Sequence, residues 1–408
     1  MFELDYDLVI VGGGAAGFFA AINTVSNNPD LRVLIIEKNK EALQKVKVSG
    51  GGRCNVTHDC FQASELIKNY PRGKEFLLKP FERFGPNETI AWFNNRGVGI
   101  KKEADGRMFP ASNTSQTILD LFHDEVKRLG IELRCSERVT NFEKEEDSWK
   151  IDLLKGESLR TGCLMLATGS DRTIWESLKK LDLEIVAPVP SLFTFKIEDE
   201  ELRALAGNSF LNSKASIPDI ETTGPALITH WGMSGPSILK LSAFAARELE
   251  KKNYVFKLKM DFLPELSDKM VLEHLKNFQT DNPKKKVLST PLFDLSKRFW
   301  EFLCKRSNVG EFQNWSETGK KHFKLFQDNL KKMVFDVTGK STFKEEFVTA
   351  GGVALSEVNP DTFEVIKHPT LFMAGEVLNI DAITGGFNFQ AAWTGGWHVA
   401  KGISKIKT

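Results

Sequence analysis

The first 37 residues constrain the fold of this chain more than any other stretch. An apolar, β-branched run, Asp7 to Val11, leads directly into a G-x-G-x-x-G sequence at 12–17. A helical stretch of about 15–25 overlaps this sequence, and a second apolar run at 33–36 ends at Glu37. A buried strand, a glycine turn, a helix and a second strand form the opening unit of a parallel α/β domain.

The three glycines have separate roles in such a unit. Gly12 permits a tight turn, Gly14 lets the backbone approach a pyrophosphate, and Gly17 allows the helix to pack closely on the strand. Phosphates favour the helix N-terminus because its free N–H groups and its dipole attract negative charge. Glu37 can accept hydrogen bonds from ribose hydroxyls. The pattern therefore predicts a Rossmann-like dinucleotide site.

A second glycine-rich stretch, Ser49 to Asn55, follows the second strand with the sequence SGGGRCN. Consecutive glycines suit a loop whose backbone lies close to a ligand, and Arg53 can donate charge-assisted hydrogen bonds to a pyrophosphate or a flavin. A mobile surface loop is the alternative interpretation. The stretch favours FAD over NAD as the dinucleotide.

Two later segments are similar to those of flavoproteins with the glutathione-reductase type of fold. One is Leu164 to Gly169, an apolar strand that ends in Ala-Thr-Gly. The other is Leu371 to Glu376, a strand that ends in Gly-acid and leads through 384–390 into a final helix to about Gly402. In that type of flavoprotein the acid reaches the ribityl chain and the last helix points at the flavin.

Along its whole length the chain resembles the BaiN-like (YhiN-like) family of FAD-dependent oxidoreductases. The matching motifs are VIVGGGAAG, SGGGRCNVT, DGRMFP at 105–110, ATGS, THWGMSGPS at 229–237 and AGEVLNIDAITGGFNFQAAWTGG. The sequence departs from the expected pattern at Ser170, Asn379 and Ala382.

The motifs and this resemblance together imply a non-covalently bound FAD, with Val139 meeting the adenine through its backbone. The implied cofactor contacts are Gly12, Gly14, Ala16, Gly17, Glu37, Lys38, Gly51, Gly52, Arg53, Cys54, Val139, Thr168, Gly169, Glu376, Asp381, Gly386, Phe387 and Asn388.

The middle of the chain has a different pattern. Short alternating strands at 193–197, 210–217 and 254–258 predict a small antiparallel sheet or barrel, and 264–334 reads as helical. The predicted fold class is α/β, with a discontinuous FAD-binding domain and an inserted β-rich domain that carries a helical subdomain. The expected boundaries are 1–190 with 348–408, 191–263 with 335–347, and 264–334.

The helical stretch holds 14 Lys and Arg against 9 Asp and Glu, although the whole chain has a formal charge of only +1. A solvated helical face, an electrostatic funnel for an anionic substrate and a nucleic-acid surface are the three interpretations. The lysines alternate with acids, which favours the solvated face. We therefore expect a small-molecule substrate, no nucleic-acid or membrane partner, and an oligomeric state that the sequence leaves open.

Two residues are candidates for chemistry beyond the cofactor. His230 lies in the turn-like 229–237 segment and could handle a proton, although a structural role is the more common one for such a histidine. Cys54 could belong to a redox-active disulfide, because the fold resembles that of disulfide reductases. Such enzymes need two cysteines close in sequence, and Cys60 is six residues away, so we expect Cys54 to be a small, packed cysteine. The five cysteines show no metal-ligand spacing, so no metal site is predicted, and they suit a reducing cytoplasm.

The expected function is an FAD-dependent oxidoreductase for a small organic substrate, with NAD(P)H as a transient donor to the flavin. No second G-x-G-x-x-G opens a helix after a strand, so a separate NAD(P)H domain is not expected. The alternatives are a flavin-dependent oxidase of a small amine and a non-catalytic flavin-binding protein that senses redox state or serves a partner.

Overall fold

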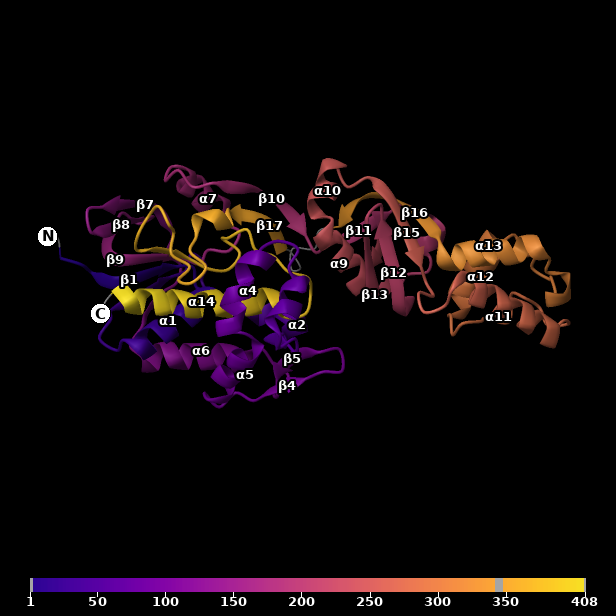
Figure 1. The fold of residues 1–408 in the computed structure, drawn as a ribbon, viewed down its shortest axis with the longest axis horizontal. Coiled ribbons are helices and arrows are strands. Elements are labelled where there is room, and N and C mark those ends of the chain that lie inside the picture. Colours follow the sequence, from indigo (N-terminus) through magenta and orange to yellow (C-terminus); the bar gives the residue numbers. More distant parts are fainter. Residues whose placement is uncertain (1–2, 342–347, 407–408) are drawn as a thin grey trace. The chain divides into compact units, whose positions relative to one another are not determined.

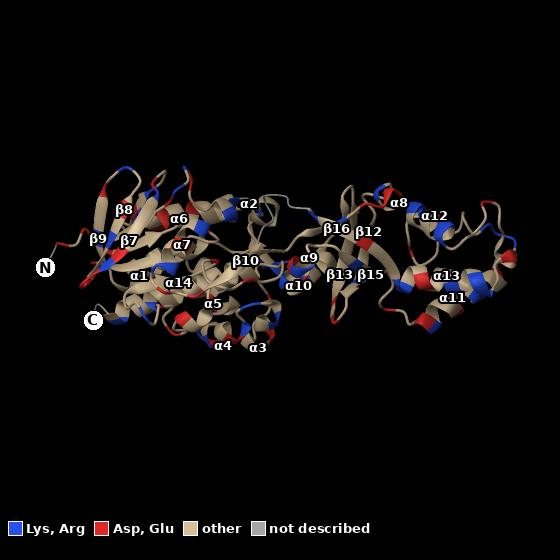
Figure 2. Cartoon of the chain, turned by 90° about the horizontal axis from the view of Figure 1, so that it is seen from above, with Lys and Arg blue, Asp and Glu red and all other residues tan. Residues whose placement is uncertain are grey.

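The computed structural model describes residues 3–341 and 348–406 (Figure 1). They form two compact units, residues 3–189 with 348–406 and residues 190–341. The end of the expected barrel domain, 342–347, lies outside the described residues, as do 1–2 and 407–408. Lys and Arg residues and Asp and Glu residues are found along the elements of each unit (Figure 2).

The first unit is built on a seven-stranded sheet with the order β6-β2-β1-β9-β8-β7, in which β18 also pairs with β9. Its strands are β1 (Tyr6–Val11), β2 (Val33–Ile36), β6 (Glu132–Arg134), β7 (Val139–Glu145), β8 (Ser148–Leu153), β9 (Ser158–Leu166) and β18 (Leu371–Met373). β1, β2, β6, β9 and β18 are parallel, and β7 and β8 add an antiparallel edge. Because Val11 aligns with Ile36 and Leu166, and Leu166 with Met373, four strands end along one edge of the sheet.

Two long helices from the two ends of the chain pack against each other, α1 (Ala15–Asn27) and α14 (Phe387–Ile406) (Figure 1). Their backbones approach closely at Gly396, where an added Cβ would lie 2.8 Å from the carbonyl oxygen of Ala16. Phe19, Trp92 and Trp393 pack as rings around this helix pair. The C-terminal helix therefore completes the domain that the N-terminal strand begins.

Shorter elements surround the sheet. They are α2 (Gln44–Gly52), β3 (Thr57–His58), α3 (Ala63–Leu66), α4 (Lys74–Arg83), α5 (Pro86–Asn94), β4 (Ile100–Lys102), β5 (Arg107–Pro110), α6 (Gln116–Arg128), α7 (Arg172–Lys179), β10 (Ile185–Ser191) and β17 (Val348–Val353).

The second unit contains a closed barrel with the strand order β11-β14-β13-β12-β15-β16. The strands are β11 (Thr194–Ile197), β12 (Ser209–Ile217), β13 (Ile220–Thr229), β14 (Gly232–Ser234), β15 (Phe256–Asp261) and β16 (Met333–Ser341). The helices α8 (Glu200–Arg203), α9 (Pro236–Phe244) and α10 (Ala246–Lys251) lie between its strands in the sequence. The predicted fold class, a Rossmann-like α/β domain with an inserted β-rich domain, is confirmed.

A helical insert follows β15 and returns the chain to β16. It consists of α11 (Asp268–Asp281), α12 (Lys297–Arg306) and α13 (Lys320–Lys331). Buried side chains of the barrel, such as Phe195 and Leu258, and of the insert, such as Trp300 and Phe326, belong to one continuous hydrophobic cluster. The insert and the barrel therefore share a core. No helix in the described residues combines the length and the apolar character that a membrane span needs.

Candidate functional site

Gly12 and Gly17 are glycines because the protein itself leaves no room for a side chain. Gly12 has a φ of +114°, and an added Cβ would lie 2.3 Å from the carbonyl oxygen of Ala167. A Cβ on Gly17 would lie 2.1 Å from the carbonyl oxygen of Gly12. These two positions fix the turn between β1 and α1 and its contact with β9.

At Gly14, by contrast, the packing of the protein does not require a glycine. Its backbone is extended, with φ −96° and ψ −169°, a conformation that any residue adopts. Apart from Gly14 itself and its two chain neighbours, no heavy atom of the described residues lies within 4 Å of the Cβ position. Gly14 is also the N-cap of α1, where no side chain caps the helix and the first turn holds no acid. Free N–H groups therefore face open space, and a bound anionic ligand is what would require glycine here.

Glu37 lies at the end of β2 beside this turn. Its Oε2 accepts a hydrogen bond from the Gly13 N–H at 2.9 Å, and Oε1 accepts one from the Asn39 N–H at 2.8 Å. The backbone of Glu137 donates to the Glu37 carbonyl at 3.0 Å, which brings the start of β7 at Val139 near the same place. Hydrogen bonds within the protein thus orient the Glu37 carboxylate toward the turn without the help of a ligand.

The SGGGRCN stretch adopts the backbone that its glycines allow. Gly50, Gly51 and Gly52 have φ values of +58°, +68° and +81°, and Cys54 has +59°. Apart from neighbouring residues of the chain, no atom of the described residues lies within 4 Å of a Cβ added to Gly51 or Gly52, whereas a Cβ on Gly50 would lie 2.9 Å from the Phe109 ring. The helix α2 is therefore interrupted, and two of its three left-handed glycines, Gly51 and Gly52, present their backbone to open space.

Thr168 and Gly169 follow β9 at the same edge of the sheet as Glu376, which follows β18. An added Cβ on Gly169 would lie 3.7 Å from Oε2 of Glu376. Within the described residues the buried Oγ1 of Thr168 has no hydrogen-bond partner, and neither does the buried Oδ1 of Asn379. Unsatisfied buried polar atoms are costly, so a ligand group that bonds them fits this edge.

We define the cradle as the surface formed by Gly14, Glu37, Gly51–Gly52, Thr168–Gly169 and Glu376. Open glycine backbone, a helix N-terminus, an oriented carboxylate and an orphaned hydroxyl suit the pyrophosphate and ribose groups of FAD. The residues present therefore fit the dinucleotide that the sequence predicts.

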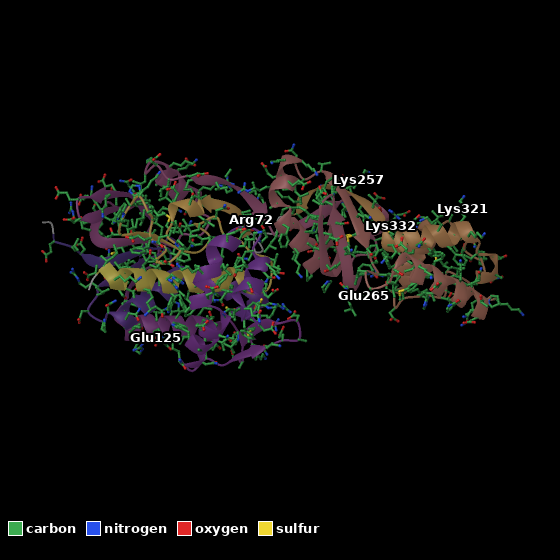
Figure 3. All side chains as sticks on the ribbon, in the orientation of Figure 1. Arg72, Glu125, Lys257, Glu265, Lys321 and Lys332 are labelled. Carbon is green, nitrogen blue, oxygen red and sulfur yellow. The ribbon has the colours of Figure 1, made fainter. Side chains whose placement is uncertain are left out.

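The charged side chains of four predicted contacts have oppositely charged partners within the protein. Three of them form ion pairs: Lys38 with Asp171, where Nζ lies 2.5 Å from Oδ2, Arg53 with Glu103, and Glu376 with Lys45. Asp381 is fully buried and forms a bidentate pair with Arg72, which Figure 3 labels. A ligand must compete for the first three groups, whereas the fourth has a structural role already.

At the N-terminus of α14 the rings of Phe387 and His58 are stacked, with centroids 4.7 Å apart. Asn388 closes the preceding turn, because its Oδ1 accepts from the Ala382 N–H at 3.0 Å. Tyr70 donates to the carbonyl of Phe387 at 2.6 Å. Gly386 is held against Thr57, whose carbonyl oxygen would be 2.6 Å from an added Cβ.

His58 and its neighbour Asp59 are residues that the sequence analysis missed. Nδ1 of His58 lies 3.2 Å from Oδ1 of Asp59, and Lys102 pairs with the other carboxylate oxygen at 2.7 Å. The signal in the sequence is position, because His58 directly follows the SGGGRCNVT motif. A titratable pair thus lies beside Phe387, a predicted flavin contact.

Cys54 is fully buried in the cradle wall. Burial raises the pKa of its thiol to about 12, against an opposing hydrogen bond from Ser49. The five cysteines all lie in the described residues, and none of them forms a disulfide. A neutral thiol of this kind is a packing group and a poor nucleophile.

His230 lies in the exposed turn between β13 and β14, in the second unit. The expected loop around it contains the short strand β14, and α9 begins at Pro236. The cradle belongs to the first unit, so a catalytic role for His230 stays a prediction.

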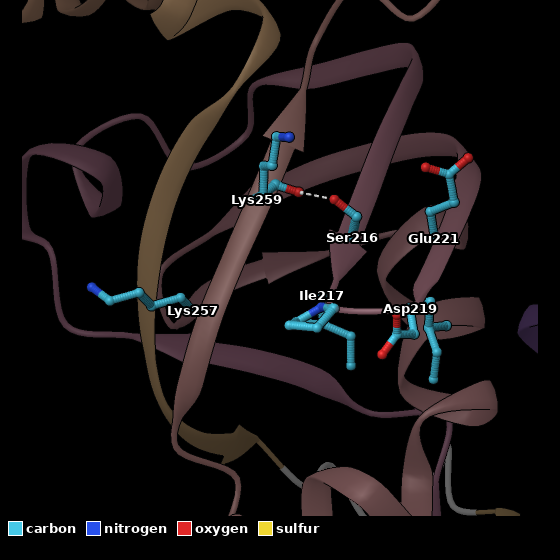
Figure 4. A pocket seen from close by; sticks show the side chains of 8 residues that line it. Ser216, Ile217, Asp219, Glu221, Lys257 and Lys259 are labelled. Carbon is cyan, nitrogen blue, oxygen red and sulfur yellow. Dashed lines mark hydrogen bonds between the residues drawn. The ribbon is translucent and has the colours of Figure 1, made fainter.

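The second unit also has an open hollow of about 520 Å³ at the turn between β12 and β13 (Figure 4). The Ser216 hydroxyl there donates to the Lys259 carbonyl at 3.4 Å. The lining residues are Ser216, Ile217, Pro218, Asp219, Ile220, Glu221, Lys257 and Lys259. None of them is a predicted site residue.

Residues 6–402 match the protein family described as HI0933-like protein Rossmann domain. The chain belongs to this family. Its members are flavoprotein oxidoreductases, so the predicted family resemblance is confirmed.

Two relatives match over nearly their whole length. The ribosomal RNA dihydrouridine synthase of Escherichia coli (strain K12) is 25% identical over 423 residues, which cover 99% of each chain. The 3-dehydro-bile acid delta(4,6)-reductase of Clostridium scindens is 27% identical over 95% of this chain and 96% of its own. Among solved structures, the 3-ketosteroid delta1-dehydrogenase of Sterolibacterium denitrificans is 12% identical with a TM-score of 0.52, and the match covers 98% of this chain and 99% of that one. That similarity supports the fold alone.

Proposed function

We propose that this family member binds FAD non-covalently in the cradle and reduces a carbon–carbon double bond conjugated to a carbonyl group. The observation that carries the cofactor assignment is Gly14, an extended glycine at a helix N-terminus with open space where a side chain would be. When bound, FAD supplies the hydride chemistry. The substrate and the electron donor are part of the proposal.

The activities for which the two relatives are named support the type of bond that we propose is reduced. Dihydrouridine is uridine in which the ring double bond next to a carbonyl is saturated, and a delta(4,6)-reductase saturates double bonds conjugated to a 3-oxo group. The two substrates differ in size and charge, but they share the same electronic pattern. An activated double bond is therefore the substrate feature that we carry over to this chain.

Reduction of such a bond also needs a proton at the second carbon. His58 is the titratable group that packs on Phe387, and Asp59 forms an ion pair with it whenever the imidazole is protonated. Lys102 holds the same carboxylate from its other side. We propose that His58 supplies this proton, directly or through a water.

NAD(P)H is proposed as the donor, docking transiently. The described units offer one Rossmann-like sheet, and the second unit is a barrel with helices. A dedicated nicotinamide domain is therefore not part of this proposal.

The test is the oxidation of the reduced protein. Protein reduced anaerobically with dithionite is mixed with a 3-oxo-4-ene steroid or with a uridine-containing RNA oligonucleotide, and oxidised protein is mixed separately with a small primary amine. Reoxidation by the steroid or the RNA, followed by recovery of the saturated product, is expected. If neither compound reoxidises the protein, while the amine reduces the oxidised protein, the chain is an amine oxidase and the proposal fails.

A further inference from the structure

Six lysines gather at the end of the helical insert that lies away from the barrel. We define the insert tip as residues 276–286 and 311–321. Its lysines are exposed, and among the described residues none of their ammonium groups has a partner carboxylate within ion-pair distance: they are Lys276, Lys284, Lys285, Lys286, Lys320 and Lys321. The tip contains three acids, Asp281, Glu311 and Glu317. Figure 3 labels Lys321 at the outer end of α13 and Lys332 at its barrel end.

Other lysines of the same helices are paired. Lys269 lies 3.7 Å from Glu273, Lys297 lies 3.9 Å from Glu301, and Nζ of Lys324 lies 2.7 Å from Oδ1 of Asp328; the members of each pair share one helix. The alternation of charges in the sequence therefore corresponds to ion pairs within single helices. At the tip six lysines have no carboxylate partner among the described residues, so the alternation of lysines with acids that favoured a solvated helical face does not extend to the tip.

Two of the tip lysines lie where they do not help the fold. Lys320 and Lys321 are the first two residues of α13, and its first turn holds no acid. The positive end of a helix dipole disfavours cations, so lysines at this position cost stability rather than add to it. A negatively charged partner would reverse the sign of this effect.

The tip also exposes an aromatic ring. Phe312 is 71% exposed, and Nζ of Lys286 lies 4.8 Å from its ring centroid. An exposed ring flanked by lysines suits a stacked base beside a phosphate backbone.

The tip backbone is held by hydrogen bonds between its two segments. The N–H of Ser316 donates to the Pro283 carbonyl at 2.9 Å, and the N–H of Trp315 donates to the Lys285 carbonyl at 2.9 Å. The Trp315 ring is fully buried, and Gln279 donates to the Trp315 carbonyl at 2.6 Å. The lysines therefore sit on an ordered surface.

We infer that the insert tip is a docking surface for single-stranded RNA, with lysines on the phosphates and Phe312 stacked on a base. This inference rests on the proposed function, in that it names RNA as the carrier of the activated double bond. Charge complementarity and the exposed ring carry it, and a full-length relative named as a ribosomal RNA dihydrouridine synthase gives the partner class.

The experiment measures binding of a fluorescent, uridine-containing 20-nucleotide RNA to the flavin-loaded protein by anisotropy, over a series of salt concentrations. The combined variant Lys284→Ala, Lys285→Ala and Lys286→Ala should bind about tenfold or more weakly at about 0.1 M salt, and its salt slope should fall by about one for each phosphate that is no longer neutralised by a lysine. Phe312→Ala should weaken binding by about fivefold or more and leave the salt slope unchanged.

The matched control removes three paired lysines of the same insert, as Lys269→Ala, Lys297→Ala and Lys324→Ala. It carries the same change in net charge and should bind RNA as the wild type does. Equally weakened binding in the control and the tip variant would overturn the inference, as would binding of anionic phosphatidylserine vesicles in place of RNA. RNA binding at the tip, with no reoxidation of the reduced protein by either the RNA or the steroid, would support the docking surface and refute the proposed reaction. Reoxidation by the steroid without RNA binding would support the proposed reaction and overturn the docking surface.

Discussion

In the turn after β1, some glycines are required by the packing of the protein and another is required only by a bound ligand. At Gly12 and Gly17 a side chain would collide with backbone atoms at 2.3 Å and 2.1 Å. At Gly14 a side chain would meet nothing and needs no unusual backbone. The same motif therefore contains two structural glycines and one whose role depends on the ligand.

This contrast predicts different outcomes for two small substitutions. Gly14→Ala should fold with a melting temperature near that of the ligand-free wild type, but it should purify nearly colourless because the methyl group occupies the place of the pyrophosphate. Gly17→Ala should be destabilised by about 1–3 kcal/mol through overpacking. Visible flavin absorbance relative to protein absorbance, together with thermal unfolding, measures both. A fully yellow Gly14→Ala protein would show that the phosphates lie elsewhere.

The thiol of Cys54 gives a second prediction at this scale. With a pKa of about 12, it is almost wholly protonated at pH 8, because thiolate forms only as the pH rises toward that value. In the folded protein Cys54 should resist iodoacetamide at pH 8, whereas Cys60, which is partly exposed, should react. Peptide mass spectrometry reads both sites. Rapid labelling of Cys54, or loss of turnover in flavin-loaded Cys54→Ser, would revive a redox role for it.

Helices and strands were predictable from the sequence where their patterns are local. The run Val33–Ile36 is observed as β2 with the expected bounds, and the helix expected at about 15–25 is observed at Ala15–Asn27. The ion pairs that occupy Arg53, Glu376 and Asp381 were not predictable, because their partners lie 50, 331 and 309 residues away in the chain. The stack of His58 on Phe387 likewise joins two ends of the sequence and leaves no periodic signal.

A buried carboxylate on α6, Glu125, gives a pH-dependent prediction. The Arg128 and Arg96 guanidinium groups hold the pKa of Glu125 below its ordinary value of 4.5, and Figure 3 labels this residue. Nε of Arg128 lies 2.8 Å from Oε1 and Nε of Arg96 lies 3.1 Å from Oε2 of Glu125, so the chain just after α5 is tied to α6.

A carboxylate with a lowered pKa stabilises the fold above its unfolded pKa, and this contribution is lost as the pH falls through the folded pKa. Glu125→Gln should therefore lower the free energy of unfolding by about 1–2 kcal/mol at pH 7, and the difference should shrink below about pH 4.5. Urea denaturation at pH 7 and at pH 3.5 tests the sign. A difference that is the same at both pH values would mean that the ion pairs contribute nothing.

At the scale of the whole molecule, the two units offer the electron donor no binding domain of its own. One unit contains the cradle, and the other combines a barrel and helices around a single core. No second dinucleotide motif is present in the sequence. A donor that docks without its own domain should bind weakly and through scattered charges.

Anaerobic stopped-flow mixing with NADH and with NADPH measures this expectation. Flavin bleaching should have a half-saturating nucleotide concentration well above the low micromolar range, and this concentration should rise further with added salt. Saturation at low micromolar nucleotide that is insensitive to salt would point to a dedicated nicotinamide site.

The central claim is that the cradle of the first unit holds FAD, and the flavin itself tests it most directly. Purified protein is denatured by heat, and the released chromophore is identified by chromatography and quantified against the protein. We expect FAD, released without a covalent link, at close to one molecule per chain. Release of FMN or of NAD alone, or a colourless protein that cannot be loaded with FAD, would contradict it.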